Sequence, residues 1–265
     1  MQLTDSFHID LDVARRRQQT NAWAKAVLLL AMGLYFVWVI ASGNLPNYIN
    51  ERFAWLSYVA AAVLLLLGAH GIWRLLRPAR SPISDDPLLQ LVSARQEEHR
   101  PISWGVLAIV AFPLVLGTLI PSRPLGAESV SSISTSAVSA ANVAEFQIDP
   151  LQRNVLDWLR VFNSSSDFSE FNGERADLIG FMYREPTFGE NQFMIARFTV
   201  SCCVADASAL GVPAHWAETA TVEQGQWIRV QGVFQVGSFR DNTLPILQVE
   251  SVELIDEPAH PYLYP

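Results

Sequence analysis

The chain has 265 residues, of which 50% are hydrophobic and only 17% charged, and its formal net charge at pH 7 is −8. This composition is closer to that of a membrane protein than to that of an average soluble enzyme. After residue 120 the sequence has 8 basic and 18 acidic side chains and no lysine, so this part alone has a net charge of −10. Such an acidic region argues against nucleic acid as a partner, because phosphates require a basic surface.

Three apolar blocks, at residues 23–41, 53–73 and 104–120, follow a polar amino-terminal segment at 1–22. Each is about as long as the ~17–25 residues that a helix needs to cross the hydrocarbon core. They predict three transmembrane helices. A cleaved signal peptide is the alternative for the first block, but its apolar stretch exceeds the ~7–15 residues typical of one. A buried helix of a soluble core is the alternative for the third block, which contains Pro113.

The basic residues predict the orientation of these helices. Arginines precede the first block and fill the loop between the second and third blocks, whereas the loop between the first and second offers only Arg52. Cytoplasmic loops carry the excess of Lys and Arg. We therefore expect a multi-pass protein of the cell membrane, in contact with lipid, with a cytoplasmic amino terminus and an extracytoplasmic region after residue 120. The arginines concerned are Arg15, Arg16, Arg17, Arg74, Arg77, Arg80, Arg95 and Arg100.

Residues 121–148 are rich in Ser and Ala and predict a flexible tether. Asp149 and Pro150 then resemble a helix start, and apolar residues at helical spacing predict one amphipathic helix of about four turns that ends near Asn163. This helix could pack on the domain behind it or lie on the membrane surface. The acidic balance of the region favours packing.

The remaining sequence predicts β-strands at 176–184, 192–201, 226–236 and 245–255, which are rich in β-branched and aromatic residues. Gly180 and Gly232, in mid-strand, indicate bends or bulges of a small closed sheet. The expected fold class is thus a membrane α-helical region followed by an all-β domain at 149–265, an OB-like small Greek-key barrel with one amphipathic helix before it. A fragment of a β-sandwich is the alternative. The proline-rich residues 258–265 are not expected to extend a sheet.

Cys202 and Cys203 are the only cysteines of the chain, and Asp206 and His215 follow them. Neighbouring side chains on a strand point to opposite faces, so the two thiols can share a ligand or a bond only where the backbone turns. Three interpretations stay open. The pair could form a redox-labile vicinal disulfide, or it could hold a soft or borderline metal ion such as Zn²⁺ with Asp206 and His215. Alternatively, one or both thiols are buried small hydrophobic residues.

Arg197 precedes the thiol pair by five residues. It could lower a thiol pKa or hold Asp206, or it could belong to a structural ion pair. No phosphate-binding glycine loop, nucleophile elbow or HExxH sequence is present, so the sequence gives no reason to expect an enzyme or catalytic residues.

Several stretches resemble one known family. They are residues 43–53, residues 113–125, Ala196-Arg-Phe-Thr-Val-Ser-Cys-Cys-Val-Ala-Asp-Ala207 and residues 226–232, together with the closing residues 258–262. The chain resembles the YcgQ-like proteins, which are described as subunits of a two-component membrane permease. The resemblance implies a membrane protein that works beside a separate multi-span YcgR-like permease. It implies no catalytic residues.

The favoured hypothesis is a non-enzymatic accessory subunit whose extracytoplasmic barrel presents a ligand or metal to the permease, or gates it. A stand-alone membrane-tethered thiol-redox or metal-relay protein is the alternative. A third hypothesis is a binding module for an oligosaccharide or peptide, with Trp216, Trp227 and Phe239 as exposed platform aromatics.

Overall fold

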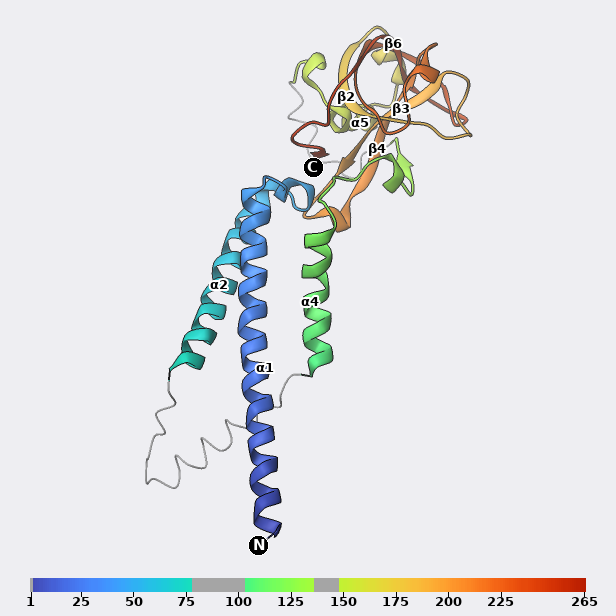
Figure 1. The fold of residues 1–265 in the computed structure, drawn as a ribbon. Helices are drawn as coiled ribbons and strands as arrows, with labels where there is room; N and C mark the ends of the chain where they lie inside the picture. The colour runs from blue at the N-terminus through green and yellow to red at the C-terminus, as the bar shows by residue number, and fades with distance from the viewer. Residues whose placement is uncertain (1, 78–102, 136–147) are drawn as a thin grey trace. The chain divides into compact units, whose positions relative to one another are not determined.

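The computed structural model describes residues 2–77, 103–135 and 148–265 (Figure 1), with the backbone alone for 2–15, 17 and 18. The chain forms two compact units. The helical unit consists of Met1–Asn44 and Ala54–Ser122, and the barrel unit consists of Leu45–Phe53 and Arg123–Pro265. The barrel unit is therefore discontinuous in sequence, because it includes the segment between the first two helices.

The helical unit contains α1 (Gln2–Ala41), α2 (Ala54–Leu76) and α4 (Trp104–Leu119). Within the described residues, two helical stretches are long and apolar enough to cross a membrane, Gln19–Ala41 and Glu51–Leu76. Their most apolar windows are only 17% and 11% buried, unlike a helix in a soluble core. At 1.5 Å per residue, the 16 residues of α4 span about 24 Å. The three predicted spans are thus two such helices and one shorter apolar helix.

Close backbone contact holds α1 against α2. A methyl group in place of the Gly68 hydrogen would lie 2.7 Å from the side chain of Leu30, so only glycine fits here. Small residues at such interfaces allow helices to approach closely without a polar contact. Of the arginines that predicted the orientation, Arg80, Arg95 and Arg100 lie outside the described residues.

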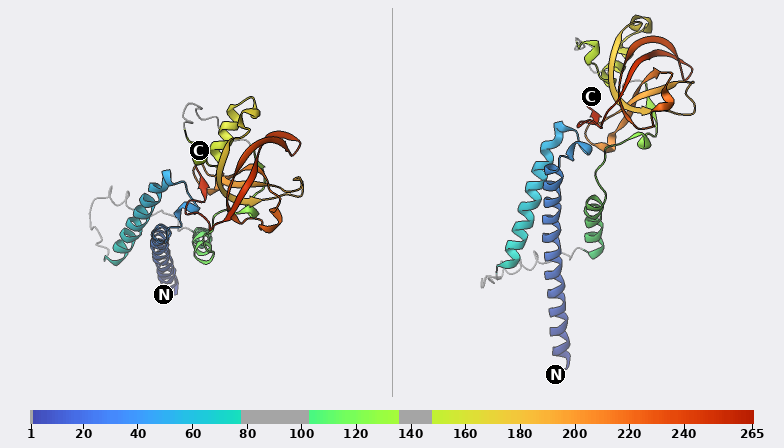
Figure 2. Two further views of the ribbon diagram at one scale, coloured as in Figure 1. Left: turned by 90° about the horizontal axis from the view of Figure 1, so that it is seen from above. Right: turned by 45° about the horizontal axis from the view of Figure 1, so that its top comes forward.

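Five strands of the barrel unit close on themselves (Figure 2) in the order β2-β3-β4-β6-β5-β2. β4 and β6 are parallel, and the other neighbours in this ring are antiparallel. Their bounds are β2 (Arg175–Tyr183), β3 (Gln192–Thr199), β4 (Ser208–His215), β5 (Trp227–Phe239) and β6 (Asn242–Leu254). An all-β barrel follows the apolar helices, as predicted, but β4 was not among the predicted strands.

Two short strands pair with strands of this ring as additional partners. β1 (Ile133–Ser134) pairs with β4 in parallel, and β7 (Tyr262–Leu263) pairs with β3 in parallel. Ile133 is buried, so residues up to 135 differ from the tether that we predicted for 121–148. Residues 136–147 of that tether lie outside the described residues. The expectation that 258–265 cannot extend a sheet was wrong, because two residues between the prolines are free to pair.

The amphipathic helix is α5 (Val155–Ser164), which is shorter than predicted. Asp149 and Pro150 begin a separate 3₁₀ turn, η5 (Pro150–Gln152), and the N-cap of α5 is Asn154, whose side chain accepts hydrogen bonds from the next turn. The buried face of α5 packs on the barrel core, the alternative that the acidic balance favoured. Its residues are Val155, Leu156, Trp158, Leu159 and Phe162.

The other 3₁₀ turns in the part of the chain that the structure describes are η1 (Leu45–Asn47), η2 (Glu51–Phe53), η3 (Ala127–Ser129), η6 (Phe168–Phe171), η7 (Val204–Asp206) and η8 (Thr219–Thr221). The β5–β6 register shifts between Gln231 and Gly232, which is the irregularity expected at this glycine. The three residues do not form an exposed aromatic platform. Phe239 is fully buried, and Trp216 and Trp227 are half-buried and pack against the core, which argues against an oligosaccharide or peptide platform.

Candidate thiol site

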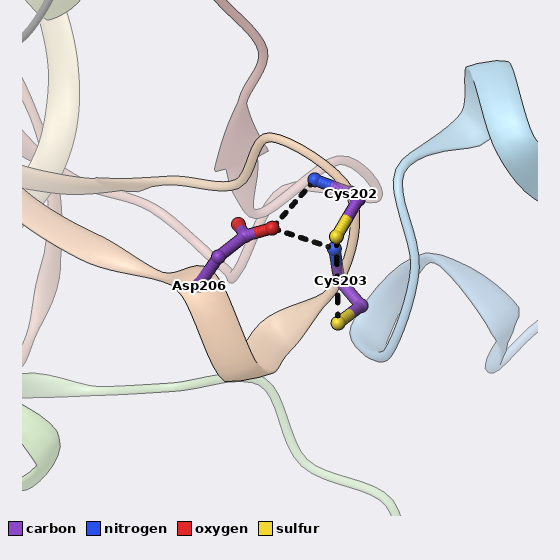
Figure 3. A group of neighbouring side chains, drawn as sticks. All are labelled: Cys202, Cys203 and Asp206. Carbon is purple, nitrogen blue, oxygen red and sulfur yellow. Dashed lines mark hydrogen bonds between the residues drawn. The ribbon is translucent and has the colours of Figure 1, made fainter.

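Cys202 and Cys203 lie in the connection between β3 and β4, in residues 201–206, which we call the thiol turn (Figure 3). Cys203 has an extended backbone and caps η7, where Asp206 occupies the third position. The backbone thus turns at the cysteines, the condition under which both sulfurs can serve one ligand. Cys202 is exposed and Cys203 half-buried, and both are free thiols, which removes the interpretation that both are core residues.

The Asp206 carboxylate organises the thiol turn. Its Oδ1 accepts a 2.7 Å hydrogen bond from the backbone N–H of Ser201, and its Oδ2 accepts bonds of 2.7 and 3.2 Å from those of Cys202 and Cys203. Hydrogen bonding by the Cys202 thiol and by these N–H groups lowers the pKa of Asp206 to about 2. The carboxylate is therefore ionised at neutral pH, and backbone N–H groups use three of its roughly four acceptor positions.

The two sulfur atoms lie 3.8 Å apart, with the Cys202 thiol donating to the Cys203 sulfur. Hydrogen bonds to Asp206, the larger cause, and to Cys203 raise the pKa of the Cys202 thiol to about 11. Both sulfurs and a carboxylate oxygen of Asp206 lie within 4.8 Å of one another, which makes them one group of potential metal ligands within the described residues. A ligand set of two sulfurs and one carboxylate suits a thiophilic ion.

The segment between the first two helices, Leu45–Phe53, binds the opposite side of the thiol turn, and we call it the interhelical segment. Ile49 and Cys203 form an antiparallel bridge, in which Asn50 N–H donates to Cys202 O at 3.1 Å and Val204 N–H donates to Tyr48 O at 2.9 Å. In Figure 3 the pale-blue ribbon beside the cysteines includes this segment. Its sequence was part of the family resemblance, but no local pattern predicted this contact.

Asn50 is the buried anchor of the interhelical segment, with 6% of its surface exposed. Its side-chain amide donates to Ser201 O at 2.9 Å and to Val200 O at 3.4 Å, and its Oδ1 accepts from Arg52 N–H. A second anchor is the tail of the chain, where His260 Nδ1 and Glu51 Oε1 lie 2.6 Å apart. The Tyr262 hydroxyl donates to Asn47 O.

His215 does not belong to the thiol site, contrary to its place among the ligand candidates. It ends β4, whereas the thiol turn precedes Ser208 at the start of the same strand. Seven residues at ~3.3 Å per residue place His215 about 23 Å along the strand from Ser208. Closeness in sequence was misleading here because the intervening residues are an extended strand.

Arg197 does not contact the thiol site, although its position before the cysteines suggested such a role. It is buried and donates hydrogen bonds to three carbonyl oxygens, those of Pro261 at 3.0 Å, His260 at 2.7 Å and Ile179 at 3.3 Å. Desolvation by burial lowers its pKa to about 10, so it remains charged at neutral pH. Arg197 therefore holds the tail of the chain on the barrel and neither activates a thiol nor binds Asp206.

Comparison with known proteins gives matches along nearly the whole chain. Residues 24–135 match the DUF1980 N-terminal domain, and residues 133–265 match the DUF1980 C-terminal domain. The UPF0703 protein YcgQ of Bacillus subtilis is 22% identical over 91% of this chain and 98% of its own length. A Streptococcus mutans protein named "Putative two-component membrane permease complex subunit" is 23% identical over 84% of this chain and 92% of its own length.

These matches confirm the resemblance to YcgQ-like proteins that the sequence motifs indicated. The boundary between the two matched domains falls at β1, where the helical part of the sequence gives way to the barrel. Both the apolar helices and the barrel with its thiol turn are thus parts of one family pattern, and the chain belongs to the DUF1980 family.

Proposed function

We propose that this protein is a non-enzymatic accessory subunit of a two-component membrane permease and that its thiol turn presents a thiophilic metal ion to that permease. The name of the Streptococcus mutans relative supports the first part, because that relative aligns with this chain over 92% of its own length. The geometry of Cys202, Cys203 and Asp206 supports the second part.

The separation of the two sulfurs is the observation that carries the metal assignment. Two sulfurs bonded at ~2.3 Å to one tetrahedral ion, with an angle of about 109° between the bonds, lie about 3.8 Å apart. The sulfurs of Cys202 and Cys203 are 3.8 Å apart in the free turn. This separation supports chelation of one ion by both sulfurs. Asp206 would supply a third bond from the acceptor position that now faces the Cys202 thiol, because the thiol loses its proton when an ion binds.

The raised pKa of Cys202 disfavours the alternative of a stand-alone thiol-redox protein. Thiol exchange requires a thiolate, and reactive cysteines have a lowered pKa. The pKa of Cys202 is instead raised to about 11 by the neighbouring carboxylate and thiol. An incoming cation reverses this effect, because it replaces the thiol proton and is attracted by the same carboxylate.

The docking of the interhelical segment supports three membrane crossings. Residues 45–53 and the barrel belong to one unit, so both lie on the same side of the membrane. The chain leaves that side after Phe53 and returns before Arg123, which requires two crossings, by α2 and by α4. The 24 Å length of α4 then implies local thinning of the bilayer or polar anchoring at its ends. Together with the arginine distribution, this supports a cytoplasmic amino terminus and a barrel outside the cytoplasm.

The apolar helices support the need for a partner. Val27–Ile40 and Val59–Leu67 contain no charged residue, and transport pathways for ions are lined by ionisable or hydrogen-bonding side chains. The multi-span partner, a YcgR-like permease, would supply that pathway. We further infer that the barrel is of the OB type, which its closed ring of five strands and parallel β4–β6 pair support.

Metal content of the full chain, purified in mild detergent after growth with added zinc, tests the proposal. The wild-type protein should contain about one ion per chain, and Cys202→Ser with Cys203→Ser should contain none while keeping its fold. His215→Ala is the matched control and should retain the ion, because this residue is remote from the thiol turn. Purification from the native membrane should also recover a multi-span partner. A metal-free wild type, or a metal-bound double serine variant, would refute the site.

A further inference from the structure

The thiol turn has two functions that use the same residues. Cys202 contributes a sulfur to the chelating pair and a carbonyl oxygen that accepts from Asn50 N–H. Cys203 contributes the second sulfur and forms the bridge with Ile49. The backbone conformation that places the sulfurs 3.8 Å apart is therefore the same conformation that presents hydrogen-bonding groups to the interhelical segment.

The interhelical segment holds this conformation by contacts that do not involve sulfur. The buried Asn50 amide bonds to the carbonyl of Ser201, the residue just before the thiol pair, and Val204 N–H, just after it, is bonded by Tyr48 O. The turn is thus bonded at both ends by one short segment. When that segment leaves, the carbonyls of Ser201 and Cys202 lose their partners, and the turn gains freedom to open.

We propose that metal binding at the thiol turn and docking of the interhelical segment are reciprocally coupled, so that undocking of the segment releases the ion. This inference rests on the proposed metal site. The physical reason is ordering entropy: a docked segment has already fixed the turn, so the ion binds without ordering it, and a bound ion fixes the turn for the segment. Reciprocity is required thermodynamically, because each event changes the free energy of the other by the same amount.

The coupling connects the site to the membrane through the covalent chain. Three residues, Ser42 to Asn44, separate the end of α1 from the interhelical segment, and α2 begins directly after Phe53. A permease that binds α1 and α2 and shifts them would therefore pull the interhelical segment with them. The ion would be held tightly until the partner acts and would then be released beside it, which is what a presenting subunit requires.

Affinity for Cd²⁺, a thiophilic probe whose thiolate complexes absorb in the ultraviolet, tests the coupling on the full chain in detergent. Asn50→Ala removes the buried anchor and leaves all three ligands in place. We expect its Kd for Cd²⁺ to rise by about 5- to 150-fold, the range of typical coupling free energies. Asn44→Ala is the matched control. Asn44 precedes the segment and its side chain bonds only to Ser42 Oγ among the contacts described, so its Kd should equal that of the wild type.

Hydrogen exchange on the wild-type protein gives a second readout that needs no variant. Saturating Cd²⁺ should slow exchange at Asn50 N–H and Val204 N–H, the two amides that join the segment to the turn. Equal Cd²⁺ affinity of the wild type and Asn50→Ala, or exchange at these amides that Cd²⁺ does not change, would overturn the coupling while leaving the metal site intact. If the wild type binds no Cd²⁺, the proposed function itself fails, which is a distinguishable result.

Discussion

Replacement of Arg197 by methionine is expected to detach the tail of the chain and to destabilise the barrel. Methionine keeps much of the apolar volume but leaves the carbonyls of His260 and Pro261 without their donor in a buried site. The two shorter hydrogen bonds, at 2.7 and 3.0 Å, come from a charged donor. At about 1.5–3 kcal/mol for each such bond, the loss amounts to about 3–6 kcal/mol. This is a large share of the ~5–15 kcal/mol by which a domain is stable.

Pulse proteolysis of the full chain in mild detergent, over a urea series, measures this loss. With a urea dependence of ~2 kcal/mol per M, a loss of about 4 kcal/mol lowers the midpoint by about 2 M. Arg175→Met is the matched control, because Arg175 is exposed and pairs with Glu250 at the surface, where an ion pair contributes at most ~1 kcal/mol. Equal midpoints for Arg197→Met and Arg175→Met would refute the role of Arg197 as the anchor of the tail.

Three further changes follow from the site and the core. Asp206→Asn should speed alkylation of Cys202 at pH 8, because loss of the carboxylate lowers the pKa of this thiol from about 11. In the wild type the alkylation rate should rise about tenfold per pH unit until the pH reaches the pKa of Cys202. Gly232→Ala should cost about 1–3 kcal/mol in the same proteolysis assay, since its methyl group would overlap Gln248 O. Trp158→Ala should cost about 3–5 kcal/mol there, because Trp158 is fully buried.

Each of these expectations has a contrary outcome. Unchanged alkylation in Asp206→Asn would mean that the carboxylate does not control the thiol pKa. A Gly232→Ala protein as stable as the wild type would mean that the β5–β6 bulge can relax around a side chain. A Trp158→Ala protein with a normal midpoint would mean that α5 contributes little to the stability of the barrel.

The sequence predicted those parts of the fold that depend on local pattern. Runs of β-branched and aromatic residues predicted β2, β3, β5 and β6 at nearly their observed bounds. β4 was not predicted because it contains Gly211 and Pro213, two residue types that normally indicate a turn. Seven of its residues are nevertheless buried or half-buried. The start of α5 was misplaced because Asp149 and Pro150 give the signal of a helix start but begin a separate 3₁₀ turn.

The sequence predicted which residues form the candidate site, but it did not predict which segment packs against them. Two adjacent cysteines and Asp206 stood out in the sequence, and the turn brings these three together. The interhelical segment could not be foreseen, because Asn50 and Ser201 are 151 residues apart and their contact is a property of the tertiary structure. His215 and Arg197 were assigned by sequence distance, which a strand of eight residues converts into a large separation in space.

A barrel that includes nine residues from between two apolar helices cannot be isolated by cutting the chain once. A soluble fragment starting after α4 would keep the five strands and lose Asn50, so its thiol turn would be exposed to water on both sides. The same constraint applies during synthesis. Residues 45–53 are made long before the strands, so the segment has no partner until the whole barrel sequence has followed.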